Sequence, residues 1–282
     1  MSRGISINIG VDAPRGCKCA RQRLAGAEND ARAMAAFSAR RGFDTVPLLA
    51  GDARRDVVAG AVAAAAGTLE AGDTLLLTFG GHGCQYRDDD PRPEYDGYDE
   101  SWCLADGPLL DDRLHDLLEP FRAGVRVVIV SDSCHSGSML SRFAGEHGKH
   151  GAYVPPERVE ALLQRRRARI AAGRCPGGPC GAPETITCLE LDRTPSRVPL
   201  GASVLLLAAC GGGEGAYEEK SRGLFTEVLL GLLASAAPPA NYAELILHSH
   251  QEVTSRNHRQ NPGWACRGVP DPSVFLAEPF TI

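Results

Sequence analysis

Two short apolar segments, each followed directly by small residues and a reactive side chain, constrain the fold of this 282-residue chain most strongly. Residues 74–79 are followed by Gly-Gly-His82-Gly, and residues 125–131 are followed by Asp-Ser-Cys134-His. Short, largely apolar runs of this length are typical of strands buried on both faces of a parallel sheet. In open α/β sheets, ligand sites form at the carboxyl ends of such strands. We therefore expect His82 and Cys134 to meet at one edge of a sheet.

Strand and helix signals alternate along the chain, which predicts an α/β fold with a mostly parallel central sheet and helices on both faces. The other expected strands are Ile5–Gly10, Thr45–Leu49, Ser101–Ala105, Val204–Ala209 and Val274–Leu276. The expected helices are Ala27–Arg41, one capped by Asp52 that runs to Glu70, one from Asp111 or Asp112 to Pro120, Leu224–Ala236 and Tyr242–Arg256.

Residues 141–199 interrupt this alternation. The segment is rich in glycine, proline and arginine, and a basic helix is expected at Pro155–Ala172, followed by a flexible Gly/Pro/Cys run. We predict a single domain over residues 1–282, in which a larger unit (1–140) and a smaller unit (200–282) are joined by this insertion (141–199).

Composition excludes several classes of function. A net charge of −5 gives no electrostatic footprint for nucleic acid. No segment is long and apolar enough for a membrane span or a signal peptide, so we expect a cytoplasmic protein without a membrane partner. The ten cysteines are expected to be reduced thiols rather than a disulfide framework, and their spacing does not favour a zinc site.

A cysteine and a histidine at one sheet edge can form a nucleophile–base pair. Cys134 is the candidate nucleophile, and His82 the candidate base and later acid. The neighbouring His135 is a rival base, but adjacent side chains point apart, so we expect it to be structural. The backbone N–H groups of Gly83 and Cys134 are candidates for an oxyanion hole.

At this point the chain resembles a known family. Phe79-Gly-Gly-His82-Gly83 and Asp132-Ser-Cys134-His135-Ser-Gly137 resemble the two signatures of the caspase-like cysteine proteases, with the closest match in the metacaspase branch, of the bacterial style without a prodomain. Weaker matches are Asn29-Asp30-Ala31, residues 96–106, 110–114, 208–210, 216–218, 223–226 and 260–262. The resemblance implies a caspase-like three-layer sandwich and a cysteine-type endopeptidase, and it leans towards a monomer.

The resemblance also implies a specificity pocket and a metal site. In metacaspases the pocket for the residue before the scissile bond takes arginine or lysine, and the matching acids here are Asp30 and Asp132; the alternative is that they only favour a helix N-terminus and a turn. Asp99, Asp111 and Asp112 match calcium ligands of calcium-dependent members, although Ser141 stands where a further aspartate is expected. Helix capping by Asp111 and Asp112 is the alternative.

We therefore predict an endopeptidase that cleaves protein substrates after arginine or lysine, needs no cofactor for its chemistry and has calcium as a candidate activator. Two alternatives stay open, namely a catalytically inactive scaffold on the same fold and an Asp-specific caspase-type protease. The insertion carries candidate processing sites for the enzyme itself or for an upstream protease: Arg165, Arg166, Arg167, Arg169 and Arg174. A solvated basic helix without a regulatory role is the simpler alternative.

Overall fold

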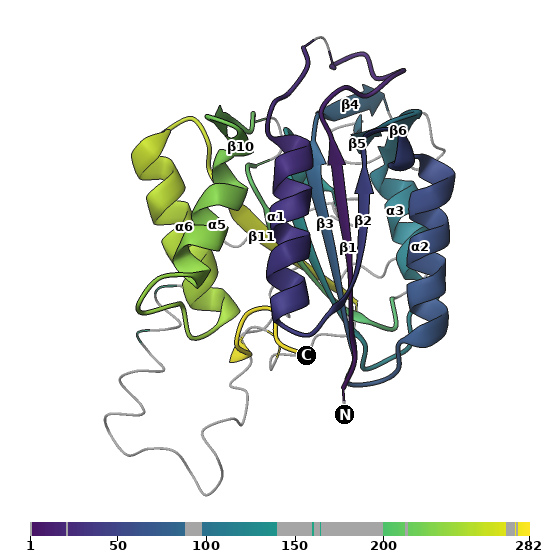
Figure 1. Ribbon diagram of the computed structural model, residues 1–282, viewed down its shortest axis with the longest axis vertical. Coiled ribbons are helices and arrows are strands. Elements are labelled where there is room, and N and C mark those ends of the chain that lie inside the picture. The colour runs from purple at the N-terminus through teal and green to yellow at the C-terminus, as the bar shows by residue number, and fades with distance from the viewer. Residues whose placement is uncertain are drawn as a thin grey trace, which may run out of the picture.

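The computed structural model describes residues 2–20, 22–87, 98–139, 160, 164, 200–211, 214–268, 274 and 276–282. Within these residues, six strands form a central sheet in the order β11-β8-β7-β3-β1-β2 (Figure 1). The strands are β1 (Gly4–Val11), β2 (Asp44–Leu49), β3 (Thr74–Gly81), β7 (Arg126–Asp132), β8 (Ser203–Ala208) and β11 (Gly263–Gly268). Neighbouring strands are parallel except β8 and β11, which confirms the predicted α/β class with a mostly parallel sheet.

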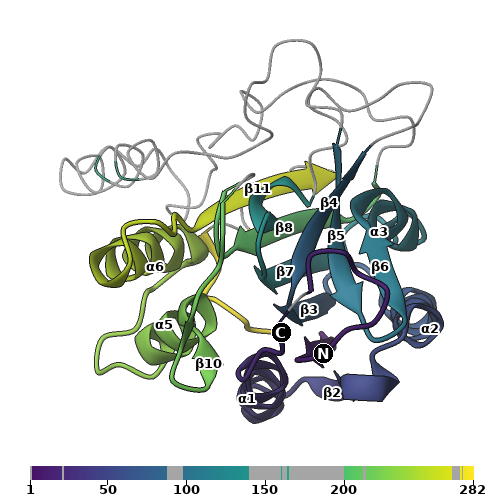
Figure 2. The ribbon, with the colours of Figure 1, turned by 90° about the horizontal axis from the view of Figure 1, so that it is seen from above.

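Helices cover both faces of this sheet, so the molecule has three layers (Figures 1 and 2). One face carries α1 (Ala27–Arg40), α5 (Leu224–Leu233) and α6 (Tyr242–Arg256). The opposite face carries α2 (Arg55–Thr68) and α3 (Asp111–Leu118).

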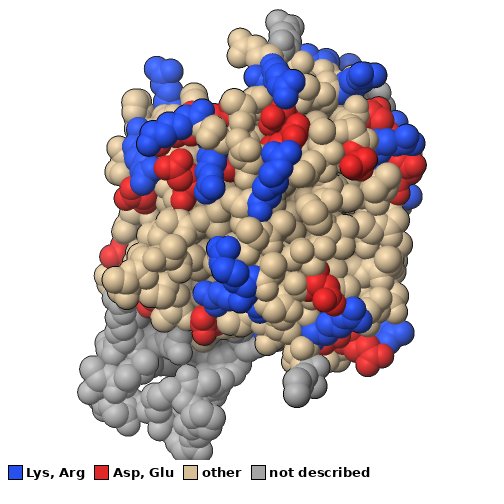
Figure 3. All heavy atoms as spheres, viewed as in Figure 1, with Lys and Arg blue, Asp and Glu red and all other residues tan. Residues whose placement is uncertain are grey.

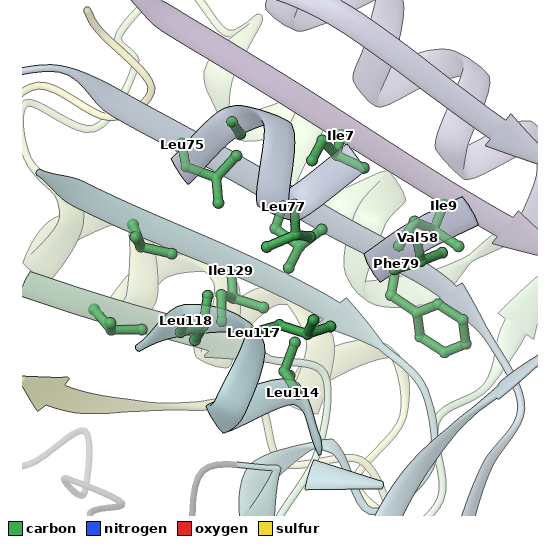
Figure 4. Packing of buried hydrophobic residues seen from close by; sticks show 14 of the residues in the cluster. Ile7, Ile9, Val58, Leu75, Leu77, Phe79, Leu114, Leu117, Leu118 and Ile129 are labelled. Atoms are coloured by element: carbon green, nitrogen blue, oxygen red, sulfur yellow. The ribbon is translucent and has the colours of Figure 1, made fainter. Parts of the chain in front are cut away.

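A hydrophobic core fills the space on each side of the sheet. Every residue of β1 and β3 is buried, as expected for strands covered on both faces. Leu77 and Ile129 from the strands pack with Val58 of α2 and Leu114 of α3 in one cluster (Figure 4). The second cluster joins the other sides of the same strands to α1, α5 and α6. Successive side chains along each strand thus point alternately into the two hydrophobic clusters.

A second, antiparallel sheet lies beyond the carboxyl end of β3. It consists of β4 (Gly83–Arg87), β5 (Tyr98–Leu104) and β6 (Gly107–Leu110). Trp102 of β5 fixes it to the central sheet, because its ring stacks on Phe79 at 4.8 Å between centroids and its Nε1 donates to Ser131 Oγ at 2.9 Å. β5 begins at Tyr98, three residues before the expected strand Ser101–Ala105.

Two local predictions are wrong, and one further element is unexpected. Within the described residues the last strand is β11, whereas Val274 and Leu276, where we predicted a strand, are helical. Asp52 ends a short 3₁₀ helix (η1, Ala50–Asp52) instead of capping α2, whose N-cap is Arg54. A two-stranded ribbon, β9 (Glu218–Glu219) and β10 (Arg222–Gly223), precedes α5 and was not predicted.

The surface in the view of Figure 3 carries basic and acidic side chains interspersed, so positive charge does not gather into one patch on that face. None of the helices in the described part of the chain has both the length and the apolar character needed to cross a membrane.

Candidate functional site

The ladder between β3 and β7 brings the two sequence motifs to the same edge of the sheet. It ends on the pair Gly80 and Asp132, and His82 and Cys134 each follow two residues later. The backbones of the two motifs then touch: a Cβ atom added to Gly83 would overlap the carbonyl of Cys134 and lie 3.3 Å from its nitrogen. Only glycine allows this approach. The structure therefore places the candidate base, nucleophile and oxyanion donors together.

A backbone carbonyl determines which nitrogen of His82 carries the proton. His82 Nε2 lies 2.7 Å from the carbonyl oxygen of Gln22, in the loop between β1 and α1. A carbonyl oxygen can only accept, so Nε2 must be the donor. In the neutral ring, Nδ1 then has a free lone pair, as a general base requires. This partner could not be predicted from the sequence, because any residue type carries a backbone oxygen.

The loop that carries Cys134 is held by the chain that follows β8. Ser136 Oγ donates to the carbonyl of Cys210 at 3.4 Å and accepts from its N–H at 3.3 Å. The N–H of His135 donates to the carbonyl of Glu214 at 3.0 Å. Cys134 itself is half-buried, with its Sγ 4.0 Å from the carbonyl of Ala216. The larger and smaller units thus build the nucleophile loop jointly.

His135 differs from His82 in its backbone and its surroundings. It lies in the left-handed region with φ 58°, beside η2 (Ser136–Ser138). Burial lowers the pKa of its imidazole.

The two predicted pocket acids meet at Gly223, the residue before α5. Asp30 and Asp132 are 3% and 6% exposed. Gly223 N–H donates to Asp30 Oδ2 at 2.8 Å, and Asp132 Oδ2 accepts from both the N–H and the Oγ1 of Thr226 at 2.8 Å. A Cβ atom on Gly223 would lie 2.9 Å from Asp30 Oδ2 and would overlap Asp132. The absence of a side chain at Gly223 lets the two carboxylates approach each other.

Burial and mutual repulsion change the protonation of this acid pair. Burial, then the charge of Asp132, raises the pKa of Asp30 to about 9. Burial raises the pKa of Asp132 to about 6, although its bonds from Thr226 favour the ionised form. Near neutral pH the pair therefore holds one proton. Asp30 Oδ1 is buried and has no hydrogen-bond partner among the described residues.

A third carboxylate, Glu218 of β9, belongs to the same acidic region. Its carboxylate accepts from the N–H groups of Ala25 and Gly26 just before α1, the latter at 2.8 Å. Its charge contributes, after burial, to the raised pKa values of both Asp30 and Asp132. Glu218 belongs to the weak family match at residues 216–218, which by itself does not assign the glutamate to the pocket.

The three predicted metal ligands also come together. Asp99 of β5 and Asp111 and Asp112 of α3 each bring a carboxylate oxygen within 4.8 Å of the others. Asp111 Oδ1 accepts the N–H of Asp112 at 3.0 Å. Leu110 occupies the N-cap position of α3 and makes no side-chain cap bond, but the Asp111 bond to the N–H of Asp112 satisfies a donor of the first turn, so the capping alternative stays open. Clustered carboxylate oxygens are the donors that Ca²⁺ prefers.

The candidate processing residues Arg165, Arg166, Arg167, Arg169 and Arg174 lie outside the described residues. The described cysteines correct one expectation from the sequence. Cys19 and Cys84 form a disulfide across 65 positions of sequence, with their Cα atoms 5.6 Å apart. Five others are thiols: Cys17, Cys103, Cys134, Cys210 and Cys266.

Comparison with known proteins shows where this combination of motifs occurs. The sequence profile of the caspase domain matches residues 12–272. Metacaspase III c of Phaeodactylum tricornutum is 45% identical over 76 residues, which are 25% of this chain and 23% of that protein. Metacaspase-1 of Saccharomyces cerevisiae is 42% identical over 73 residues, which are 24% of this chain and 17% of that protein. The matched stretches thus span less than a quarter of these relatives.

Two solved structures resemble the whole chain. Protein GSU0716 from Geobacter sulfurreducens is 30% identical, with a TM-score of 0.69 and coverage of 99% of both chains. Caspase-1 from Spodoptera frugiperda is 13% identical, with a TM-score of 0.55 over 95% of this chain and 88% of that one. The second likeness concerns the fold alone and confirms the caspase-like sandwich.

Proposed function

Because this chain belongs to the caspase domain family, we propose that it is a cysteine endopeptidase that cleaves after arginine or lysine, with Cys134 as nucleophile and His82 as base. The observation that carries the proposal is the joint placement of His82 and Cys134 beside a buried acid pair.

The proposed reaction has two halves. In the first, His82 Nδ1 takes the thiol proton of Cys134 while the sulfur attacks the carbonyl carbon of the scissile bond. The backbone N–H groups of Gly83 and Cys134 stabilise the oxyanion, each contributing about 3 kcal/mol. His82 then gives the proton to the leaving amine. In the second half, His82 deprotonates a water that hydrolyses the thioester, which releases the acid and restores the thiol.

The acid pair supports specificity for a cation. A guanidinium or ammonium group that reaches Gly223 meets Asp132, which is largely ionised near neutral pH, and Asp30, which binds a proton. Entry of the cation favours ionisation of both carboxylates and releases that proton. The unpartnered Asp30 Oδ1 is available for a second bond from a planar guanidinium fork. An aspartate side chain would instead meet like charge, which disfavours the Asp-specific alternative.

A panel of otherwise identical fluorogenic peptides ending in arginine, lysine or aspartate tests this function. We expect cleavage of the first two and none of the third, with Cys134→Ala as the inactive control. Cleavage after aspartate would contradict the pocket assignment. A wild-type enzyme that cleaves none of the peptides and resists alkylation at Cys134 would favour a scaffold without catalysis.

We also propose that Asp99, Asp111 and Asp112 hold a calcium ion that activates the enzyme. The cluster fits a hard cation in the nature of its donors. Its place supports the proposal, because Asp99 lies on β5, which carries the Trp102 that packs against Phe79 near His82. The ion would make the antiparallel sheet of β4, β5 and β6 more rigid. It would take no part in the bond-breaking steps.

Control by cleavage of the 141–199 insertion is a further part of the proposal. A protease that prefers basic residues would find sites at the five arginines named above. Replacement of all five by glutamine should give a chain that stays intact. If this variant has full, immediate activity, cleavage has no regulatory role.

A further inference from the structure

The Cys19–Cys84 disulfide lies close in sequence to both partners of the hydrogen bond between His82 and the Gln22 carbonyl. Cys19 lies three residues before Gln22, whose carbonyl accepts from His82 Nε2, and Cys84 lies two residues after His82. The covalent link and the hydrogen bond therefore join the same two chain segments. The position of the Gln22 carbonyl depends on where the disulfide holds this loop.

In the described part of the loop from Asp12 to Gly26, the other attachments are non-covalent, among them the bonds of Ala25 and Gly26 to Glu218. Arg15 N–H donates to the carbonyl of Ala105 at 3.3 Å, and Leu24 N–H donates to the carbonyl of Asp12 within the loop at 2.9 Å. The Lys18 ammonium lies 4.6 Å from the ring centroid of Tyr86, on the same strand as Cys84. Most of this loop is exposed, Gln22 included. The disulfide is the covalent contact of this part of the loop with β4, beside the weaker contacts that Cys17 and Lys18 make with Tyr86.

The two disulfide residues differ in exposure. Cys19 is exposed, whereas Cys84 is fully buried at 0% exposure. A small thiol in solution can reach the bond from the Cys19 side, so the bond is open to thiol–disulfide exchange.

We propose that Cys19 and Cys84 are positioning residues for His82, and that the oxidation state of this pair sets the turnover of the protease. The inference rests on the proposed peptidase function. In the oxidised form the loop holds the Gln22 carbonyl on Nε2–H, which keeps Nδ1 free as the base. Reduction releases the loop, and both the ring orientation and the tautomer become mixed.

The exchange needs only a disulfide or thiol of low molecular weight. Two protein thiols and one molecule of glutathione disulfide give the protein disulfide and two molecules of glutathione. A dithiol reverses this, forming its own disulfide and restoring both protein thiols. The comparison requires Cys134 to be a thiol in both the oxidised and the reduced form of the Cys19–Cys84 pair.

The test compares wild type, Cys19→Ser and the control Cys266→Ala, a half-buried thiol on β11. Each protein is equilibrated in glutathione buffers of different poise, and kcat and KM are measured on an arginine-ended peptide. Mass spectrometry after alkylation reports the state of Cys19, Cys84 and Cys134 in every sample.

We expect reduction of wild type to lower kcat by about 10- to 100-fold, the size of effect that a misplaced catalytic group produces, with KM within about twofold. Cys19→Ser should show the low kcat at every poise, and Cys266→Ala should behave like wild type. Full kcat in reduced wild type, or an unchanged redox response in Cys19→Ser, would overturn the inference.

A second readout does not need peptidase activity. Nitrogen NMR of His82, assigned by comparison with His82→Ala, reports which ring nitrogen carries the proton. We expect a single Nε2–H tautomer in the oxidised form and a mixture in the reduced form. A tautomer that does not change overturns the inference even in an inactive enzyme, whereas lack of peptide cleavage with the expected tautomer change contradicts the proposed function alone.

Discussion

Gly80 and Asp132 face each other in the parallel ladder between β3 and β7. Since His82 and Cys134 each follow two residues later, both side chains leave the sheet at the same level. Parallel strands in register thus convert two separate motifs into one site, with Asp132 adjacent to the nucleophile loop. The register therefore sets where the proposed pocket acid Asp132 lies relative to the proposed nucleophile Cys134.

The pair of motifs predicts the effect of single substitutions on catalysis. Cys134→Ala should lower kcat/KM for an arginine-ended peptide by at least about a thousandfold, and His82→Ala by nearly as much, because both act in one step. His135→Ala should have a milder effect. Steady-state kinetics measure this, and unchanged circular dichroism shows that the fold is retained. Substantial hydrolysis by Cys134→Ala would mean that another residue is the nucleophile.

The pocket carboxylates predict graded losses of binding. Asp132→Asn removes a buried negative charge. It should lower kcat/KM for arginine peptides, and the loss should correspond to about 2–5 kcal/mol of transition-state binding free energy. Glu218 is exposed, so Glu218→Gln should cost only about two- to fivefold in kcat/KM. Glu219→Gln, the adjacent residue of β9, is the matched control and should have no effect. Equal effects of the two glutamine variants would remove Glu218 from the pocket.

Asp30 predicts a pH-dependent change in stability. Its pKa is raised from 3.8 to about 9, so the folded protein binds a proton that the unfolded chain has lost. Stability from this group is therefore greatest below pH 3.8 and falls as the pH rises towards 9. Asp30→Asn has no such titration. We expect the Tm of Asp30→Asn minus the Tm of wild type to increase as the pH rises from 5 to 9.

Thermal unfolding of both proteins across this pH range measures the difference, from which other titrating groups largely cancel. The exposed Asp44→Asn serves as a control and should keep the wild-type pH profile apart from a constant offset. Parallel profiles for Asp30→Asn and wild type would show that Asp30 is ionised in the folded protein.

The cluster of Asp99, Asp111 and Asp112 predicts stabilisation by calcium. Binding to the folded state alone should raise Tm by about 2–4 °C for each kcal/mol of binding free energy. EGTA should reverse the shift, and Asp112→Asn should abolish most of it. Asp52→Asn, an exposed acid outside the cluster, should respond like wild type. If Asp112→Asn responds fully, calcium binds elsewhere.

The central strands β3 and β7 were predictable from the sequence because glycine and aspartate bound each short apolar run, which favours strand over helix. The expected strands at residues 74–79 and 125–131 correspond to β3 and β7, with boundaries that differ by one or two residues. β11 was missed since Gly263-Trp-Ala-Cys-Arg-Gly268 mixes apolar and polar residues at a sheet edge. Val274 and Leu276 are apolar but helical, which shows that a short apolar run does not distinguish strand from helix.

The candidate site was predictable where residue type carries the chemistry. His82, Cys134, Asp30 and Asp132 belong to motifs, and the fold brings them together. Glu218 comes from a ribbon of two-residue strands that has no sequence pattern of its own. The Cys19–Cys84 pairing depends on contacts between positions 65 residues apart, which local spacing does not reveal.

The ladder between β7 and β8 has a consequence for how a cleaved chain would behave. It joins residues 126–131 to residues 203–208 in the middle of the sheet, and β8 also pairs with β11. A single cut between residues 141 and 199 therefore leaves both fragments sharing one buried sheet. We expect a nicked molecule to elute from gel filtration as one particle of unchanged size. Its two fragments should separate only when a denaturant takes the sheet apart.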